Sequence, residues 1–490
     1  MSARVQIMKL PTGVPGLDEV LGGGLPELSF NLIAGPPGGG KTTLAHQIMF
    51  ATASPDRPAL FVTILGEPPA KMLRYQQQFS FFDPTKIPDS VRFLHLGDEL
   101  QSHGLEQVLG RIVAEVEATS PKLVFVDSFR AVVRKAAEPG QMELHSFVQR
   151  LAIQLTSWEA TTFLIGEYGE LEADASPIFT VADGILWLSQ ETSRNSIVRK
   201  LQVMKMRGQG QVPGIHTVKM SDAGLRIYPR LTNPNRSSIK RAAHQERRKT
   251  GVAGLDAMVG GGIPSGYSVM IVGPSGAGKT ILSTQFIIEG IKAGERGVIA
   301  VFEQRPDEYL TTAPGELARL ATDGKLRILY MRPLDLSVDE TMEELATAVR
   351  EIGATRVVID SLMGFELALA PSFRDDFRES LYRLVGALTG LGVTVMMTAE
   401  LSDSYTELRL TPHEVSFLTD GIILMRYAEI AGRLRKVLIV AKMRGFGHDD
   451  AFRLYSIDSE GIVMGEPLSD YVGILVGAPH QLAPGHVDEE

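Results

Sequence analysis

The chain has 490 residues, which is too long for one hydrophobic core and predicts two or three domains. It contains no cysteine, which excludes disulfide bonds, cysteine-based zinc sites and thiol catalysis. The formal net charge of −9 argues against a protein that coats nucleic acid, and the absence of a run of about 18 apolar residues argues against a membrane span. The N-terminus shows no charged-then-apolar signal pattern, so we expect a soluble, cytoplasmic protein.

The first strongly apolar strand, predicted at residues 30–34, runs directly into a glycine-rich loop at residues 35–42. This loop fits the pattern G-x-x-x-x-G-K-[ST] in full, and an apolar helix-like stretch follows it. In that context, backbone N–H groups surround phosphate oxygens, the lysine reaches the β- and γ-phosphates, and the threonine binds Mg²⁺. The alternative is a glycine-rich turn that binds nothing. The predicted nucleotide-binding residues here are Gly35, Gly38, Gly39, Gly40, Lys41, Thr42 and Thr43.

Two later features of this first half suit the same chemistry. Asp127 ends an apolar run at residues 123–126, where a strand-end carboxylate can hold the Mg²⁺ shell as a Walker-B aspartate does. The alternative is an aspartate that caps the next turn. Lys205 and Arg207 are two residues apart and therefore share one face of a strand. They could reach a γ-phosphate, typically that of a neighbouring subunit, or they could be surface charge on an edge strand.

The whole arrangement occurs a second time. The loop recurs at residues 273–280, and Lys279 follows Lys41 by 238 positions; residues 250–256 and 260–264 repeat residues 12–18 and 22–26. Asp360 repeats the strand-end aspartate, and Lys442 and Arg444 repeat the basic pair. The second set of predicted nucleotide-binding residues is Gly273, Ser275, Gly276, Ala277, Gly278, Lys279, Thr280 and Ile281. A repeat of this length is two whole domains, not a solenoid unit.

Within each repeat, short apolar strands alternate with longer helices. Strands are predicted at residues 59–63 and 297–302, and helices at residues 105–118 and 338–352. This alternation predicts the α/β class, with a largely parallel sheet flanked by helices in each of two tandem domains. We place the domains at residues 1–235 and 249–465, with a linker at 236–248 and a C-terminal loop and flexible tail at 466–490. The basic run in the linker is interpreted as solvated, with nucleic-acid contact as the alternative.

Hydrolysis also needs a group that orients or deprotonates water. In the second repeat, Glu303 ends the strand at residues 297–302 and is the natural candidate. In the first repeat, alignment forward from the strand places Leu65 and Gly66 opposite Glu303 and Gln304. Alignment backward from Pro69 brings Glu67 into that place, and we prefer Glu67. If Glu67 does not reach the water, the first site binds ATP and turns it over poorly.

With these motifs assembled, the chain resembles the KaiC family of the RecA-like P-loop ATPases, over residues 10–479. Residues 471–479 look like the family's C-terminal loop, which precedes a regulatory tail. The resemblance implies a two-tiered homohexamer with Mg²⁺ and ATP bound between adjacent subunits, so that the two basic pairs act on a neighbour's nucleotide. It also implies slow ATP hydrolysis in the first tier and transfer of phosphate to Ser and Thr side chains in the second. The implied metal-binding residues are Thr42, Asp127, Thr280, Asp360 and Glu303, and the implied catalytic residues are Glu303, Glu67, Lys41, Lys279, Lys205, Arg207, Lys442 and Arg444.

Two departures from the family pattern narrow the implied function. Of the family's adjacent Ser-Thr acceptor pair, Ser416 is present, but Phe417 occupies the threonine position and cannot accept phosphate; Thr411 is a nearby auxiliary hydroxyl. Of the paired glutamates, Glu303 is retained as the base for the acceptor hydroxyl and Gln304 replaces the other. The resemblance therefore implies a signalling ATPase that is a serine/threonine autokinase on Ser416, without a two-site cycle. The alternative for Ser416 is a strand-start serine bonded to backbone.

Two other classes of function compete. A DNA-handling motor of the same superfamily would present basic loops to a pore, but residues 167–181 contain Glu170, Glu172 and Asp174 with no lysine or arginine, and residues 400–420 contain Arg409 alone among several acids. Such loops repel phosphates, so neither nucleic acid nor membrane is expected as a partner. A scaffold that binds ATP without turnover is the second alternative. An unidentified regulatory protein, docking through the C-terminal tail, is the expected partner besides the chain itself.

Overall fold

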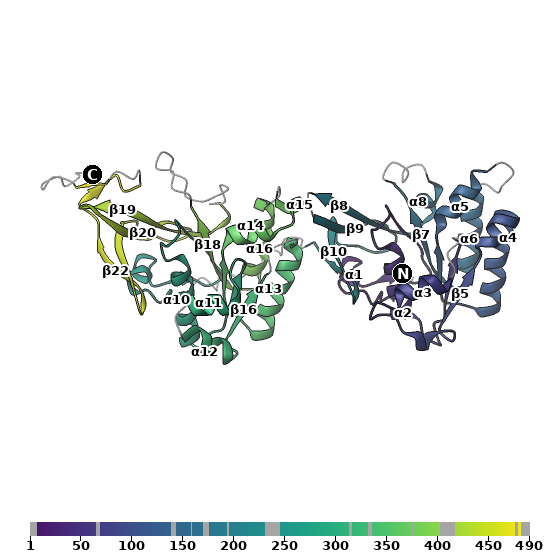
Figure 1. Cartoon of the computed structure of the whole chain (residues 1–490), viewed down its shortest axis with the longest axis horizontal. Coiled ribbons are helices and arrows are strands. Elements are labelled where there is room, and N and C mark those ends of the chain that lie inside the picture. The colour runs from purple at the N-terminus through teal and green to yellow at the C-terminus, as the bar shows by residue number, and fades with distance from the viewer. Residues whose placement is uncertain are drawn as a thin grey trace, which may run out of the picture. The chain divides into compact units, whose positions relative to one another are not determined.

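The computed structural model describes residues 7–64, 69–138, 144–157, 159–169, 176–193, 196–230, 246–312, 316–331, 336–374, 377–401, 417–475 and 479–481. The chain divides into two compact units, unit 1 (Met1–Arg230) and unit 2 (Leu231–Glu490). Each unit has its own sheet and its own helices on both faces of that sheet (Figure 1). None of the helices in the described part of the chain combines the length and the apolar character that a membrane span requires.

In the described part of unit 1, nine strands form one sheet in the order β11-β10-β9-β8-β3-β7-β6-β4-β5. Neighbours from β8 to β5 are parallel, and β9, β10 and β11 extend the sheet in antiparallel fashion. The strands are β3 (Phe30–Gly35), β4 (Ala59–Thr63), β5 (Val91–His95), β6 (Leu123–Asp127), β7 (Thr161–Glu167), β8 (Gly184–Ser193), β9 (Ser196–Met206), β10 (Ile215–Ser221) and β11 (Gly224–Tyr228), with a separate ribbon of β1 (Lys9–Leu10) and β2 (Leu25–Pro26).

The parallel strands of unit 1 are buried on both faces, as continuous apolar runs such as β3 and β4 require. One face packs against α2, through a core that includes Leu44 and Ile48, and the other packs against α4, α5 and α6, through residues such as Ile112 and Phe147. The helices are α1 (Leu17–Val20), α2 (Lys41–Thr52), α3 (Pro69–Gln76), η1 (Pro84–Lys86), α4 (Gly97–Thr119), α5 (Phe129–Ala136), α6 (Leu144–Ser157) and α8 (Pro177–Val181).

Unit 2 repeats this architecture. Within its described residues, nine strands form a sheet in the order β16-β15-β17-β18-β14-β19-β20-β21-β22, which is the strand order of unit 1. The strands are β14 (Ser268–Gly273), β15 (Gly297–Val301), β16 (Leu326–Tyr330), β17 (Arg356–Asp360), β18 (Thr394–Glu400), β19 (Gly421–Ile430), β20 (Arg433–Met443), β21 (Arg453–Asp458) and β22 (Gly461–Pro467), with ribbons of β12 (Arg247–Arg248) with β13 (Ile263–Pro264) and β23 (Tyr471–Val472) with β24 (His480–Gln481).

The helices of unit 2 cover its sheet as those of unit 1 do. Residues of α9, α10, α11 and α12 pack on one face, and residues of α13, α14 and α16 pack on the other. The helices are α9 (Ala253–Met258), α10 (Lys279–Lys292), α11 (Pro306–Thr312), α12 (Glu316–Thr322), α13 (Val338–Ile352), α14 (Leu362–Ala368), α15 (Pro371–Arg374) and α16 (Phe377–Gly390). The predicted α/β fold with tandem mostly parallel sheets is confirmed. The helix predicted at residues 338–352 is α13, whereas the one predicted at 105–118 is part of the longer α4.

The repeated opening of each unit has a structural explanation. The Thr12 hydroxyl donates to Asp18 Oδ1 at 2.7 Å, and the Thr250 hydroxyl donates to Asp256 Oδ1 at 2.8 Å. The backbone N–H of each threonine donates to the same oxygen. Both threonines are fully buried, so the matching aspartate satisfies polar groups that would otherwise be costly to bury. The recurrence of this motif therefore reflects a buried turn at the entrance to each unit.

The interpretation of the basic run as a solvated linker is wrong for Arg247 and Arg248. They form β12, and Arg247 donates to the carbonyls of Val259 and Gly262 at 2.8 and 2.9 Å. Arg248 is 7% exposed and forms ion pairs with Glu246 and Glu295. Residues 231–245, the remainder of the run, lie outside the described residues.

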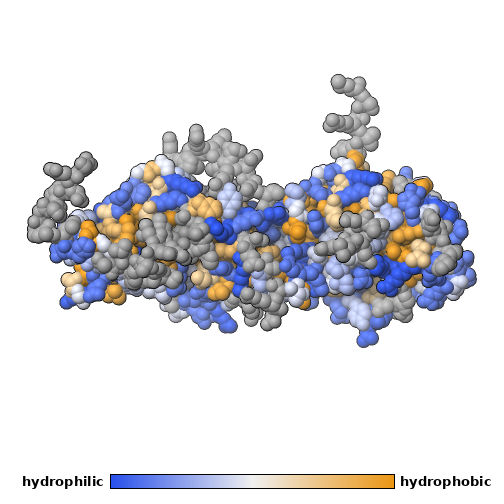
Figure 2. Space-filling model, turned by 90° about the horizontal axis from the view of Figure 1, so that it is seen from above, coloured by the Kyte–Doolittle hydropathy of each residue, from blue (hydrophilic) through white to orange (hydrophobic). Residues whose placement is uncertain are grey.

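The start of the predicted C-terminal loop and tail is also attached to unit 2. β23 pairs with β24, Ile474 is 4% exposed in a small core, and Arg426 donates to the Leu475 carbonyl at 2.5 Å. Residues 482–490, where the tail was expected to be flexible, lie outside the described residues. Figure 2 shows the visible surface as mainly hydrophilic residues with small apolar areas between them.

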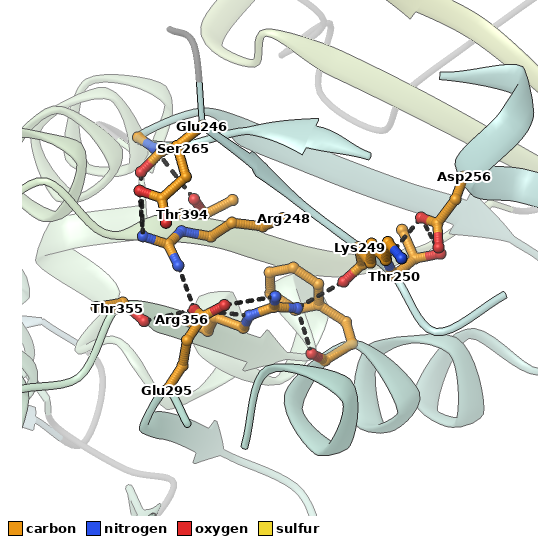
Figure 3. A network of polar contacts seen from close by, with 12 residues as sticks. Glu246, Arg248, Lys249, Thr250, Asp256, Ser265, Glu295, Thr355, Arg356 and Thr394 are labelled. Atoms are coloured by element: carbon orange, nitrogen blue, oxygen red, sulfur yellow. Dashed lines mark hydrogen bonds and ion pairs between the residues drawn. The ribbon is translucent and has the colours of Figure 1, made fainter. Parts of the chain in front are cut away.

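Unit 2 contains a buried network of ions, drawn in Figure 3. Arg356, 2% exposed, makes two parallel bonds to Glu295, with Nη2 to Oε1 at 2.8 Å and Nε to Oε2 at 3.0 Å. It also donates to the carbonyls of Lys249 and Phe286, and Arg248 contacts Glu295 from the other side. Burial opposes ionisation of Glu295, but the hydrogen bonds and charges of these partners outweigh it and hold its pKa below the usual value. The network joins β12, α10 and β17 at the sheet edge where β17 begins.

Candidate functional site

Unit 2 has a cavity of about 380 Å³ at the carboxyl ends of its parallel strands. This is the edge of an α/β sheet where ligands bind, and the volume lies within the usual range for a ligand pocket. The cavity joins the glycine-rich loop to residues at the carboxyl ends of β15, β17 and β18. Its lining residues are Ser275, Gly276, Gly278, Lys279, Thr280, Ile281, Val301, Glu303, Gln304, Tyr309, Asp360, Ser361 and Glu400. The structure therefore brings together the predicted loop, aspartate and glutamate of the second repeat.

Each glycine-rich loop ends in a helix that begins at its lysine. The residues before these helices, Gly40 and Gly278, have φ of 95° and 103°, a left-handed conformation that favours glycine. Lys41 Nζ donates to the Pro36 carbonyl at 2.7 Å, and Lys279 Nζ donates to the carbonyls of Gly273 and Pro274 at 2.8 Å. Burial lowers the pKa of both lysines, although nearby carboxylates oppose the shift. In unit 2 the N-terminus of α10 and Lys279 line the same cavity, as an anion site requires.

The two strand-end aspartates lie beside these loops but have different partners. Asp127 Oδ2 accepts from the Thr42 hydroxyl at 2.8 Å, and burial raises the pKa of Asp127 to about 6 against the opposing effects of Thr42 and Lys41. Asp360 Oδ1 accepts from the Thr398 hydroxyl at 2.5 Å, and Asp360 Oδ2 accepts from the Tyr309 hydroxyl at 3.4 Å. In both units the aspartate is followed by a serine through a cis peptide bond.

These residues fit a magnesium ion bound together with a nucleotide. Mg²⁺ commonly takes one or two protein oxygens and completes its shell with phosphates and water. Thr42 and Asp127, whose side-chain oxygens are 2.8 Å apart, offer that donor set in unit 1. The part of the chain that the structure describes contains no group of three or more His, Cys, Asp or Glu suited to a metal.

Glu303 is held in the cavity by a residue that the sequence analysis did not select. The Ser361 hydroxyl donates to Glu303 Oε1 at 2.5 Å and accepts from the Gly364 N–H at 3.1 Å. Ser361 therefore caps α14 and fixes the carboxylate at the same time. The signal in the sequence was its position directly after Asp360, in both repeats.

Two further acids lie at the site and were also missed. Glu167 ends β7 opposite Gly35, and Glu400 ends β18 opposite Gly273, so each acid pairs with the first glycine of a loop. Each also raises the pKa of the adjacent loop lysine against the dominant effect of burial. Their recurrence after two matched strands could have identified them, but the strand order that brings β7 and β18 next to the loop strands is not visible in the sequence.

Comparison with known proteins gives the family. A family model described as "ATPase: KaiC" matches residues 10–232 and 248–469. The chain belongs to the KaiC family. It is 28% identical to a circadian clock oscillator protein KaiC of Prochlorococcus marinus over 98% of this chain and 97% of that protein, and 29% identical to the KaiC of Rippkaea orientalis over 99% and 93%. A circadian clock protein KaiC3 of Synechocystis is 27% identical over 98% and 96%. Since the model matches twice, the chain is a two-domain KaiC-family ATPase.

In this KaiC-family chain the first unit has different polar residues at the end of β4. Glu67 lies outside the described residues, so its place relative to the loop remains a prediction. Thr63, the last residue of β4, contacts His95 of β5 through its hydroxyl and the ring Nδ1 at 2.8 Å. In unit 2 the matching strand ends are Val301 and Tyr330. The two units therefore differ beside the place where a water-activating residue is expected.

The basic pairs lie at the ends of β9 and β20, and the pair of unit 2 is not among the residues that line the cavity of that unit. Lys205 donates to the carbonyls of Phe179 and Thr180, and Lys442 donates to the carbonyl of Thr419. Arg207 forms an ion pair with Asp183, and Arg444 lies near the matching Asp420, while about half of each arginine side chain stays exposed. The side chains are thus anchored at their own unit, with guanidinium groups still open to solvent.

The predicted phosphoacceptor Ser416 and the auxiliary Thr411 lie outside the described residues. The next residue, Phe417, is 53% exposed, and the guanidinium of Arg378 lies 5.8 Å from the centre of its ring. The Phe417 carbonyl accepts a hydrogen bond from Arg444 at 2.7 Å. One member of the second basic pair therefore contacts the residue that follows the predicted acceptor.

Proposed function

We propose that this KaiC-family chain hydrolyses ATP and transfers phosphate to its own Ser416, as a homohexamer with nucleotide at the subunit seams. The convergence of Lys279, Asp360 and Glu303 on one cavity of unit 2 carries the proposal. A phosphoryl-transfer site needs cations near the phosphates, a metal-binding carboxylate and a group that takes the proton of the attacking hydroxyl. These three residues supply each of them.

The steps assigned to the side chains follow from their contacts. Lys279, already close to the loop carbonyls, stabilises charge on the β- and γ-phosphates. Asp360 and Thr280 would hold Mg²⁺, which supplies charge neutralisation at the transferred phosphoryl group. Glu303, oriented by Ser361, takes the proton from a water molecule in hydrolysis or from the Ser416 hydroxyl in autophosphorylation. The oxygen that loses this proton bonds to the γ-phosphorus, the bond from that phosphorus to the β–γ bridging oxygen breaks, and ADP leaves. Gln304 cannot replace Glu303, because an amide is not a base at neutral pH.

The homohexamer part of the proposal assigns the basic pairs to a neighbour's nucleotide. Arg207 and Arg444 keep solvent-facing guanidinium groups, with 60% and 45% of the side chain exposed, and Arg444 does not line the cavity of its own unit. An arginine supplied in trans stabilises charge that develops in phosphoryl transfer. Intact mass of the native assembly with and without ATP tests this part, because it reports six-fold association and covalent phosphate together.

Removal of the base in a chain whose first unit is silenced tests the catalytic part. Glu303→Gln removes the base and keeps nearly the same shape, and Lys41→Ala in the same chain silences unit 1. Relative to the chain with Lys41→Ala alone, we expect ATP turnover to fall by about 10²- to 10⁴-fold and phosphate on Ser416 to disappear, with nucleotide binding by unit 2 retained because its loop is intact. Steady-state phosphate release and phosphosite mapping by mass spectrometry are the measurements.

The competing function is a scaffold that binds ATP without turning it over. In that case Glu303→Gln changes neither phosphate release nor covalent phosphate, because there is none to lose.

The role of the relatives named as circadian clock proteins suggests a signalling output, and we propose a regulatory protein partner that docks through the C-terminal segment. A filter-binding test at low salt should show no retention of DNA, in contrast to a DNA-handling motor.

A further inference from the structure

Asp360, the expected metal ligand of unit 2, accepts hydrogen bonds from two hydroxyl groups that are not part of the loop motif. Thr398 of β18 donates to Asp360 Oδ1 at 2.5 Å, and Tyr309 of α11 donates to Asp360 Oδ2 at 3.4 Å. Thr398 is fully buried and Tyr309 is 2% exposed. The Tyr309 hydroxyl lies 3.5 Å from that of Thr284 on α10, the helix that begins at the loop lysine. Asp360 is thus tied to three different elements of unit 2.

Unit 1 has no hydroxyl at the matching positions of its sequence. Ile165 occupies the position of Thr398 and lies next to Asp127 in the register of β6 and β7. Met72, the fourth residue of α3, occupies the position of Tyr309, the fourth residue of α11. Neither side chain can donate a hydrogen bond. Asp127 is oriented instead by Thr42, which is itself an expected metal ligand.

We infer that Tyr309 and Thr398 are positioning residues that hold Asp360 ready for a divalent cation, so that unit 2 binds metal more tightly than unit 1. Residues that hydrogen-bond to a metal-binding side chain and orient it raise the affinity for the metal. Removal of such residues typically weakens metal binding by about 10- to 100-fold. When both oxygens of a carboxylate are already held by hydrogen bonds, binding of the ion carries a smaller entropic cost of ordering that side chain. This inference rests on the proposed function, since it assumes that both units bind a metal-nucleotide complex.

Manganese binding measured by electron paramagnetic resonance tests the inference without enzyme activity. The full chain with Lys41→Ala isolates unit 2, and the full chain with Lys279→Ala isolates unit 1; each is titrated with Mn²⁺ in the presence of a non-hydrolysable ATP analogue. In the unit 2 background, Tyr309→Phe together with Thr398→Val should weaken Mn²⁺ binding by about 10- to 100-fold. In the unit 1 background, Ile165→Thr should strengthen it.

A matched control separates positioning from general damage. Thr389 is a buried hydroxyl of α16 that donates to the carbonyl of Val385 within its own helix and does not line the cavity. Thr389→Val should leave the Mn²⁺ affinity unchanged, and thermal unfolding of each variant shows whether unit 2 remains folded. Affinities of the double variant within about twofold of its parent overturn the inference and leave the proposed function standing. Failure of both units to bind Mn²⁺ with nucleotide overturns the inference and the proposed function together.

Discussion

Unit 1 and unit 2 share one strand order and one loop pattern. They differ at the edge of the sheet opposite the loop, where the parallel strands begin and where the two units bury different kinds of side chain. At the start of β17, unit 2 buries Arg356 with Glu295 and Arg248. At the matching positions, unit 1 buries Leu123 and Leu10, both 1% exposed. Its remaining polar pair, Arg57 with Glu27 at 3.2 Å, stays at the surface with 39% and 31% of the side chains exposed.

Both units thus keep the glycine-rich loop and the strand-end aspartate, whereas the far edge has buried ions in unit 2 and apolar residues in unit 1. Gly290 of α10 leaves room for the Arg356 side chain, whereas Thr52 takes the matching place in unit 1. A buried ion network does not stabilise a protein more than apolar packing does, although breaking it is costly. We therefore expect the two units to have similar folds with different sensitivities to substitution and to acid.

The largest expected effect on stability comes from Glu295→Ala. The substitution leaves Arg356 buried without its carboxylate and Arg248 with only the exposed Glu246, and breaking a buried pair typically costs about 3–5 kcal/mol. Differential scanning calorimetry of the full chain should show the transition of unit 2 at lower temperature and that of unit 1 unchanged. The matched control is Glu27→Ala, which removes the exposed pair in unit 1 and should cost less than about 1 kcal/mol. Equal shifts in the two variants would show that the network has no special role.

Four simultaneous substitutions test whether unit 2 remains stable with the residues that unit 1 has at the matching positions. The variant carries Arg248→Leu, Ser265→Glu, Glu295→Arg and Arg356→Leu, which copies Leu10, Glu27, Arg57 and Leu123. Replacement of a buried ion network by apolar residues is often neutral or stabilising by about 1–4 kcal/mol. Calorimetry should therefore find the unit 2 transition at or above its original temperature. A transition as low as that of Glu295→Ala would mean that the surrounding core, with Gly290, is fitted to arginine.

Much of the fold and part of the site could be predicted from sequence because their signals are local. The glycine-rich loops and the aspartates at strand ends are short patterns next to apolar runs. The burial of Arg248 could not be predicted, because its carboxylate partner Glu295 lies far along the chain and a basic run usually indicates solvent. Glu400 and Tyr309 were missed for a related reason: the strand order and the position of α11, not sequence spacing, bring them to the cavity.

The two units should also respond differently to acid. The pKa of Glu295 is held below the usual value, so its ionised form stabilises folded unit 2 above the unfolded pKa of about 4.5, and this stabilisation is lost as the pH falls through the lower folded value. Thermal unfolding at a series of pH values below 5 should show unit 2 losing stability on this account. In Glu295→Gln that dependence should be reduced, while the dependence of unit 1 stays the same. An unchanged pH profile in Glu295→Gln would assign the acid sensitivity to other carboxylates.

The smallest expected effect concerns the nucleotide loop itself. Tyr455 of β21, 5% exposed, donates to the Ala277 carbonyl of the loop at 2.6 Å, whereas the matching residue of β10 is Val218. Tyr455→Phe removes one hydroxyl and the hydrogen bond that it donates to the loop. The loss should weaken ATP binding to unit 2 by about 0.5–1.5 kcal/mol, which is roughly a two- to tenfold rise in the Kd. Fluorescent nucleotide titration in the Lys41→Ala background measures this value, and the Lys279→Ala background reports unit 1, where no change is expected. If the variant unfolds at a lower temperature but binds ATP as before, Tyr455 contributes to packing and not to nucleotide binding. The loops of the two units would then bind the nucleotide in the same way.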